Sequence, residues 1–103
     1  MADSQFSLEG KVALVTGGSR GIGRATALGF ARAGADVVVA SRKLPDLEKV
    51  ADEITGLGRK SLAVSAHVGR MEQITSLVEK VVAEFGKIDI LVNNAGTSPV
   101  YTP

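Results

Sequence analysis

The chain has 103 residues, of which 45% are hydrophobic and 22% are charged, and its formal net charge is +1. This length allows at most one domain, and the mixed charges contain no basic block, so binding to nucleic acid or to a membrane surface is not expected. The chain has no cysteine and one histidine, His67, which excludes disulfides, thiolate metal sites and a zinc site built from histidines.

The N-terminus and the hydropathy of the chain indicate its compartment. The first ten residues, MADSQFSLEG, are polar and acidic, unlike a secretory signal or a transit peptide. No apolar run approaches the roughly 20 residues that a membrane helix needs. We therefore expect a cytoplasmic protein.

Four short apolar runs predict β-strands that are buried on both faces. They begin at Val12 (VALVTG), Val37 (VVVAS), Leu62 (LAVSA) and Ile90 (ILVNN). The runs are rich in Val, Leu and Ile and barely alternate with polar residues, as strands of a covered parallel sheet do.

Helical patterns fill the intervals between these runs. Residues 22–33 are followed by Gly34, residues 45–56 begin with Pro45, and residues 70–85 are followed by Gly86; proline at the start and glycine at the end are typical of helices. The last range carries the longest apolar stripe, which consists of Ile74, Leu77, Val78, Val81, Val82 and Phe85.

The alternation of strands and helices predicts an α/β fold with a parallel sheet. Right-handed crossovers favour the strand order 3-2-1-4, with the first two helices on one face and the third on the other. This is the first half of a Rossmann-like doubly wound parallel sheet plus the first strand of its second half, so the sheet is truncated after the fourth strand.

A glycine-rich segment, TGGSRGIG at residues 16–23, follows the first strand directly. Ligands of doubly wound sheets bind at the carboxyl ends of the strands, and a helix N-terminus there suits a phosphate. A side chain at Gly17 or Gly21 would hold the phosphate away, whereas small residues would let the helix lie close to the sheet: Gly23, Ala25, Ala27 and Gly29. A tight turn alone is the alternative, but the strand and helix around the glycines favour dinucleotide binding.

Two motifs resemble the short-chain dehydrogenase/reductase family, with its carbonyl and 3-ketoacyl reductases. They are Thr16 followed by the spacing Gly17, Gly21, Gly23, and NNAG at residues 93–96 after the fourth strand. The resemblance extends from Gly10 onward. Methyltransferases share a glycine-rich first turn, but they lack NNAG and have an acidic residue after the second strand.

The resemblance implies which residues bind the cofactor. The pyrophosphate and the nearby ribose would be lined by Gly17, Ser19, Arg20, Gly21 and Ile22, with Gly23 at the start of the helix. Asn94, Ala95 and Gly96 would pass beside the adenosine ribose and brace the sheet. Asn93 either ties the fourth strand to its neighbour or contacts the cofactor.

The family often has Asp-Val after the third strand, where the Asp reaches the adenine amino group. This chain has His67-Val68 instead, and histidine cannot be an anionic acceptor. His67 either contacts adenine or is an exposed loop residue.

The end of the second strand indicates which nicotinamide cofactor binds. It reads Ala40-Ser41-Arg42-Lys43, and the acidic Asp36 lies at the opposite end of this strand. NAD(H) is usually held there by an acid, whereas Ser41 and Arg42 suit a 2′-phosphate, which Arg20 could reach from the other side. NADP(H) is therefore predicted in preference to NAD(H). NAD(H) remains possible if Arg42 and Lys43 form only a solvated loop.

The catalytic residues of the family are missing from this chain. The resemblance implies a Tyr that acts as acid and base, a Lys four residues later, and a Ser and an Asn that position the carbonyl. Tyr101, the one tyrosine, is third from the end and cannot have that Lys.

Residues 1–103 are thus interpreted as a partial dinucleotide-binding domain, a fragment without catalytic residues. It would belong to a homo-oligomeric oxidoreductase that acts on a small carbonyl or alcohol. The alternative is a complete, non-catalytic nucleotide-binding or interaction module.

Overall fold

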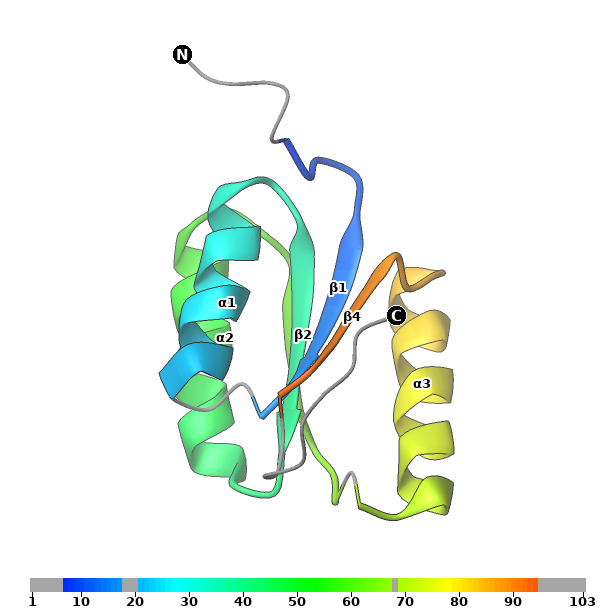
Figure 1. The fold of residues 1–103 in the computed structure, drawn as a ribbon. Helices are drawn as coiled ribbons and strands as arrows, with labels where there is room; N and C mark the ends of the chain where they lie inside the picture. The colour runs from blue at the N-terminus through cyan, green and yellow to red at the C-terminus, as the bar shows by residue number, and fades with distance from the viewer. Residues whose placement is uncertain (1–6, 18–20, 68, 95–103) are drawn as a thin grey trace.

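The structure, a computed structural model, describes residues 7–17, 21–67 and 69–94 (Figure 1). Strands and helices alternate in the order β1 (Val12–Thr16), α1 (Gly21–Arg32), β2 (Asp36–Ser41), α2 (Leu44–Gly56), β3 (Ser61–Ser65), α3 (Met71–Phe85) and β4 (Ile90–Asn93). Each bound lies within one residue of the range predicted from the sequence. Short-range patterns were sufficient to place these elements.

The four strands form one parallel sheet in the predicted order β3-β2-β1-β4. Thr16, the last residue of β1, lies opposite Ala40 of β2 on one side and opposite Asn93 of β4 on the other. Ser41 of β2 lies opposite Ser65 of β3. All carboxyl ends therefore meet at one edge of the sheet, where the loops that follow β1, β2, β3 and β4 begin.

Helices cover both faces of the sheet, as predicted: α1 and α2 lie on one side and α3 on the other (Figure 1). The core on the first face contains Ala27, Leu28, Ala31, Leu47, Val50 and Ile54 of the two helices, packed on Ala13, Val15, Val37 and Val39. The core on the α3 face contains Leu77 and Val81 of the helix, packed on Val12, Leu14, Val38 and Ala40. The alternation of inward residues along β1 and β2 thus fills two separate cores.

The prediction that all four strands are buried on both faces holds only for the central pair. Every residue of β1 is buried, whereas β3 and β4 contain only partly buried or exposed residues. The α3 stripe is likewise incomplete: Leu77 and Val81 are buried, but Val82 is 44% exposed. The reason is that β3 and β4 are edge strands in the described part of the chain and a single helix lies on the α3 face.

Two of the four small residues expected to bring α1 close to the sheet do not do so. Gly23 and Ala27 are buried, whereas Ala25 and Gly29 are exposed. The expectation for Ala25 and Gly29 was wrong because both lie on the outward face of the helix. Gly86 ends α3 as predicted, with φ +87° and its N–H donating to the Val82 carbonyl.

Candidate functional site

The candidate site lies where the strand order reverses. From β1 the chain passes through α1 to β2 on one side, and β4 returns to the other side of β1. A crevice at this switch point, outside the carboxyl ends of the strands, is where doubly wound sheets bind ligands. The glycine turn begins at the end of β1, directly at this point.

Thr16 ties the carboxyl ends of β1 and β4 together. It is 5% exposed and is the one buried polar residue in the described ranges. Its Oγ1 donates to Asn93 Oδ1 over 2.9 Å and accepts from the Asn94 N–H over 3.1 Å. The bond between Thr16 and Asn93 supports the first of the two interpretations of Asn93, in which this residue ties β4 to the neighbouring strand β1.

The glycines of the turn have different physical roles. Gly17 and Gly21 have φ of +69° and +64°, in the left-handed region that glycine tolerates best. Among the described residues, no heavy atom lies within 4 Å of a Cβ built on Gly21, which faces open space in this part of the chain. A Cβ on Gly23 would lie 2.0 Å from the Gly17 carbonyl oxygen and 3.0 Å from Asn94 Nδ2.

The first turn of α1 therefore packs against both motifs. Gly23 allows the helix to touch the Gly17 backbone and the side chain of Asn94, which follows β4. The first turn of α1 contains no acidic residue, so no carboxylate there competes for the unpaired N–H groups that favour an anion.

The structure thus brings Gly17, Gly23 and Asn94 together, and Gly21 begins α1 at the same place. Ile22, also predicted to line the cofactor, is 76% exposed. Four further residues that the sequence singled out lie outside the described residues: Ser19, Arg20, Ala95 and Gly96.

At the end of β2 the predicted cofactor-selecting residues are accessible. Arg42 and Lys43 are exposed, and neither forms an ion pair within residues 7–17, 21–67 and 69–94. The Ser41 hydroxyl accepts the Lys43 N–H over 3.1 Å, which folds the loop back toward the strand. The next acid along the chain, Asp46, lies in the first turn of α2, where a carboxylate complements the helix dipole.

Asp36 lies at the far end of β2, as predicted. It is the first residue of the strand, and its Oδ1 accepts the Lys60 N–H over 2.9 Å. Its carboxylate therefore joins β2 to the start of β3 and takes no part in the candidate site.

His67 lies in the loop between β3 and α3. Its N–H donates to Gln73 Oε1 over 2.6 Å, and its Nδ1 accepts the Gly69 N–H over 3.2 Å. Val68 lies outside the described residues. The role of Gln73 was missed from the sequence, although a glutamine three residues after the N-cap residue Arg70 resembles the glutamine of a capping box.

Asp89 was also missed, although an acid directly before a strand is a visible signal. Its Oδ2 accepts the Val12 N–H over 2.9 Å and lies 3.1 Å from Lys87 Nζ. These contacts, the Val12 N–H first and Lys87 second, lower the pKa of the Asp89 carboxyl. The residue lies at the amino end of the sheet, so its role is to fasten β1 to the start of β4.

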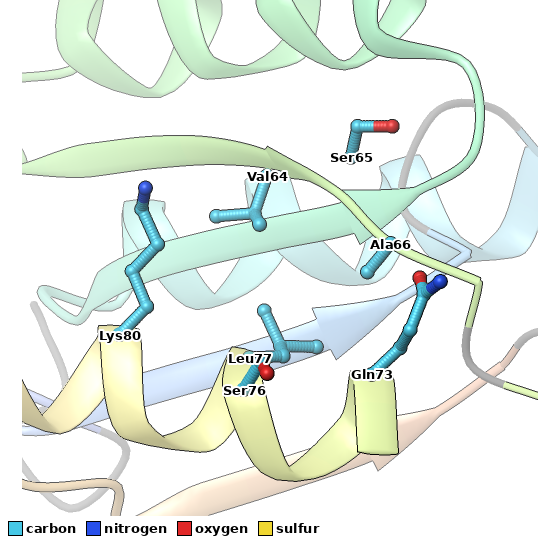
Figure 2. A pocket seen from close by; sticks show the side chains of 7 residues that line it. All are labelled: Val64, Ser65, Ala66, Gln73, Ser76, Leu77 and Lys80. Carbon is cyan, nitrogen blue, oxygen red and sulfur yellow. The ribbon is translucent and has the colours of Figure 1, made fainter. Parts of the chain in front are cut away.

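A cleft of about 270 Å³ lies between β3 and α3, away from the glycine turn (Figure 2). Val64 and Leu77 face each other across it, and the side chains of Gln73 and Lys80 rise from α3 at its two ends (Figure 2). The remaining lining residues are Ser65, Ala66 and Ser76. Among the described residues, none of those predicted to bind the cofactor lines this cleft.

Two further features are absent from the described residues. These residues contain no group of three or more His, Cys, Asp or Glu side chains that could hold a metal ion. None of the three helices α1, α2 and α3 has the length and apolar character needed to span a membrane.

Comparison with known proteins supports one family. Residues 11–102 match the family model for the short chain dehydrogenases. The chain is 48% identical over 93 residues to the 2-dehydro-3-deoxy-D-gluconate 5-dehydrogenase of Escherichia coli, covering 90% of this chain and 36% of that protein.

Solved structures agree with this match. The L-sorbose reductase of Gluconobacter frateurii, complexed with NADPH and L-sorbose, superposes with a TM-score of 0.85 at 42% identity, over 94% of this chain and 37% of that one. The RhlG/NADP complex of Pseudomonas aeruginosa also gives a TM-score of 0.85, at 38% identity, over 95% and 39% of the two chains.

In these comparisons the chain spans little more than a third of its relatives' length, 36% of the Escherichia coli enzyme for example. The matched region contains both motifs that meet at the switch point, the glycine turn and the segment that begins at Asn93. By its sequence and its strand order, the chain belongs to the short-chain dehydrogenase/reductase family.

Proposed function

We propose that this chain supplies the NADP(H)-binding region of an oxidoreductase that interconverts a carbonyl and an alcohol by hydride transfer. The observation that carries the proposal is the contact of the two motifs: Gly23 lets α1 pack against the Gly17 carbonyl and Asn94 at the switch point. A tight turn alone would not require α1 to approach the end of β4 as well.

The pyrophosphate would lie at the N-terminus of α1. Gly21 has open space where a Cβ would project, and the first turn of α1 carries no acid, so a phosphate can approach the backbone N–H groups there. Ser19 and Arg20, from the same turn, would add side-chain donors to the phosphates. Asn94, Ala95 and Gly96 would pass beside the adenosine ribose.

The preference for NADP(H) rests on the end of β2. An acid at this position would accept from the ribose hydroxyls of NAD(H), but here Ser41 is followed by two exposed cations, Arg42 and Lys43. A guanidinium binds a phosphate through two parallel hydrogen bonds. Two similar structures, the L-sorbose reductase complexed with NADPH and the RhlG/NADP complex, support the same cofactor.

The bound nicotinamide would supply or accept the hydride, and the substrate of the whole protein would be a small carbonyl compound or alcohol. This chain contains no Tyr with a Lys four residues later, so we propose that it binds the cofactor without catalysing turnover by itself. Residues 1–103 would then be part of a dinucleotide-binding domain in a cytoplasmic homo-oligomer.

Titration of the chain with NADPH and with NADH tests the proposal. We expect tighter binding of NADPH, and a loss of about 1.5–3 kcal/mol of NADPH binding free energy in Arg42→Ala, since a charged hydrogen bond to the 2′-phosphate is removed. Binding of NADH should change little in the same variant. Arg32→Ala, in the last turn of α1, is a matched control that should change neither affinity. Equal affinities of the unmodified chain for the two cofactors would refute the preference.

A further inference from the structure

β3 is an edge of the sheet in the described part of the chain, and half of its backbone groups point away from β2. The Ala66 N–H, directly after β3, donates to the Ser41 carbonyl over 2.8 Å. This bond sets the alternation of the parallel ladder, in which every second residue of β3 bonds to β2. Ala63 and Ser65 therefore direct their N–H and C=O groups outward, where these groups have no partner among the described residues.

The side chains of β3 leave an open apolar surface on the face that α3 covers. Leu62 and Val64 pack toward the core under α3, but both are only partly buried. The cleft of about 270 Å³ lies between Val64 and the buried Leu77 of α3 (Figure 2). An extended segment placed beside β3 would therefore bring its side chains on this face to the cleft.

The α3 side of the cleft offers hydrogen-bond donors and one positive charge. Gln73, Ser76 and Lys80 are three and four residues apart, so they lie along one side of the helix over about 10 Å of its axis. Gln73 Oε1 already accepts the His67 N–H over 2.6 Å, which leaves the amide N–H groups of Gln73 as donors. Lys80 is exposed and forms no ion pair within the described ranges. None of the described residues that line the cleft is acidic.

We propose that β3 and this cleft bind an extended, acidic peptide segment of a partner protein, which adds a strand to the sheet. Its backbone would pair with the outward groups of Ala63 and Ser65, the mode in which edge strands capture peptides. An apolar side chain would enter the cleft between Val64 and Leu77. The next side chain on the same face, about 7 Å further along the segment, would be a carboxylate that pairs with Lys80.

The unpaired cation of the cleft selects this partner. The edge strands of the chain itself, SLAVS in β3 and ILVN in β4, carry no acid, so they lack the group that would pair with Lys80. The surface is also independent of the proposed function, because it lies away from the glycine turn and from Arg42 at the end of β2. NADPH titration and peptide titration therefore test separate statements.

An exchange of charges tests the contact with Lys80. The probe is the labelled peptide Thr-Thr-Val-Thr-Glu-Thr-Thr with blocked ends, whose β-branched residues favour an extended backbone. We expect Lys80→Glu to weaken its binding about five- to tenfold and to favour, by a similar factor, the peptide with Lys in place of Glu. Lys49→Glu, an equal charge change at an exposed position of α2 on the other face of the sheet, should leave the preference for the Glu peptide unchanged.

Melting curves of both variants check that the fold is intact. A folded Lys80→Glu variant that keeps the preference of the unmodified chain would overturn the proposal. The same holds if Lys49→Glu changes the preference equally, because net charge would then determine binding. An unmodified chain that does not bind the Glu peptide at millimolar concentration would overturn it as well.

Two peptides methylated on alternate backbone nitrogens test the pairing with β3. One carries the methyl groups on Val and Glu, the other on the two threonines on either side of Glu. With Val and Glu facing the cleft, the threonine N–H groups face β3 in an antiparallel pair, and those of Val and Glu face it in a parallel pair. We expect one methylated peptide to bind at least about tenfold more weakly than the other, since it loses the hydrogen bonds to the strand.

Equal binding of the two methylated peptides would overturn the proposal, because an added strand cannot tolerate both patterns equally. Hexanoate, which has a carboxylate and an apolar chain but no peptide backbone, is the competitor that identifies a small-molecule site. If it displaces the Glu peptide and the two methylated peptides bind equally, the cleft binds small carboxylates and not a strand.

Discussion

The three glycines of α1 show how one residue type serves different purposes at neighbouring positions. Gly21 has a positive φ and open space around it, Gly23 is pressed against the Gly17 carbonyl, and Gly29 has a free outward face. Only Gly23 is required by a close contact between parts of the chain that are distant in sequence. The three positions should therefore respond differently to the same substitution.

Replacing Gly23 and Gly29 by alanine tests this distinction within one helix. In Gly23→Ala the new Cβ would lie 2.0 Å from the Gly17 oxygen, so the turn must shift, at a cost of about 1–3 kcal/mol of unfolding free energy. Gly29→Ala adds a methyl group in open space and should stabilise the protein by about 0.5–1 kcal/mol, because alanine has the better helix propensity.

Urea denaturation of the two variants, followed by NADPH titration, gives the comparison. We expect Gly23→Ala to lose both stability and cofactor affinity, and Gly29→Ala to keep the affinity of the unmodified chain. A Gly23→Ala variant as stable as Gly29→Ala would show that α1 does not depend on this close approach.

The sequence predicted the place of the glycine turn and distinguished Gly21, beside the phosphate, from Gly23, in the packing of the helix, but it did not show which residues Gly23 contacts. Gly23 is constrained by Asn94 Nδ2 as well as by Gly17, and Asn94 is brought there only by the pairing of β4 with β1. A local sequence pattern does not show which residues that are distant in the sequence come into contact. The same limit explains why Gln73 was not connected with His67 before the loop geometry was known.

At the scale of elements, side chains fasten β4 to β1 at both ends. Thr16 joins the carboxyl ends through Asn93 and Asn94, and Asp89 joins the amino ends through the Val12 N–H. The candidate site lies at the carboxyl ends, whereas the contact of Asp89 at the amino ends is structural. A change at Asp89 should therefore alter stability without altering the cofactor site.

Asp89→Asn tests this and has a defined pH dependence. The pKa of Asp89 is lowered in the fold, first by the Val12 N–H and then by Lys87, so its ionised form stabilises the folded state. We expect the variant to melt about 2–5 °C below the unmodified chain at neutral pH, a typical shift for a small domain. This difference should be complete above the ordinary aspartate pKa of about 4 and should shrink as the pH falls further, through the lowered pKa.

Melting curves of the two proteins between about pH 3 and pH 7 cover this transition. Glu53, whose pKa is lowered mainly by its hydrogen bond from Arg24, titrates in both proteins, so its contribution cancels in the difference. A difference that does not depend on pH would show that the charge of Asp89 contributes nothing, and that only its shape matters.

The elements themselves were predictable because each depends on local signals. Pro45 lies in the first turn of α2, and Gly86 ends α3 in the left-handed conformation. Burial was less predictable: the apolar runs of β3 and β4 resemble those of β1 and β2, yet they occupy the edges of the sheet. Which strand is central depends on the crossovers, and the covering of each face depends on how many helices lie there.

At the scale of the whole molecule, the two faces of the sheet are covered unequally. Of the described helices, α1 and α2 cover the first face and α3 covers the second (Figure 1). Ile90 and Val92 of β4 pack toward the α1 and α2 core, so Leu91 between them points to the α3 side, where it is 51% exposed. Val82 of α3 is 44% exposed. An edge strand with an apolar residue on an open face is a template for association.

We therefore expect the 103-residue chain to associate with itself through β4, and Leu91→Glu to reduce this association. A charge on an edge strand opposes pairing with another chain, and the substitution removes apolar surface from the contact.

Leu57→Glu is the matched control, because Leu57 is 42% exposed at the end of α2, away from β4. Sedimentation velocity across a concentration series should show a rising average mass for the unmodified chain and for Leu57→Glu, and a monomer for Leu91→Glu. A monomeric unmodified chain at every concentration would show that the open edge does not drive association. An equal effect of the two glutamates would indicate that net charge, not the β4 edge, controls it.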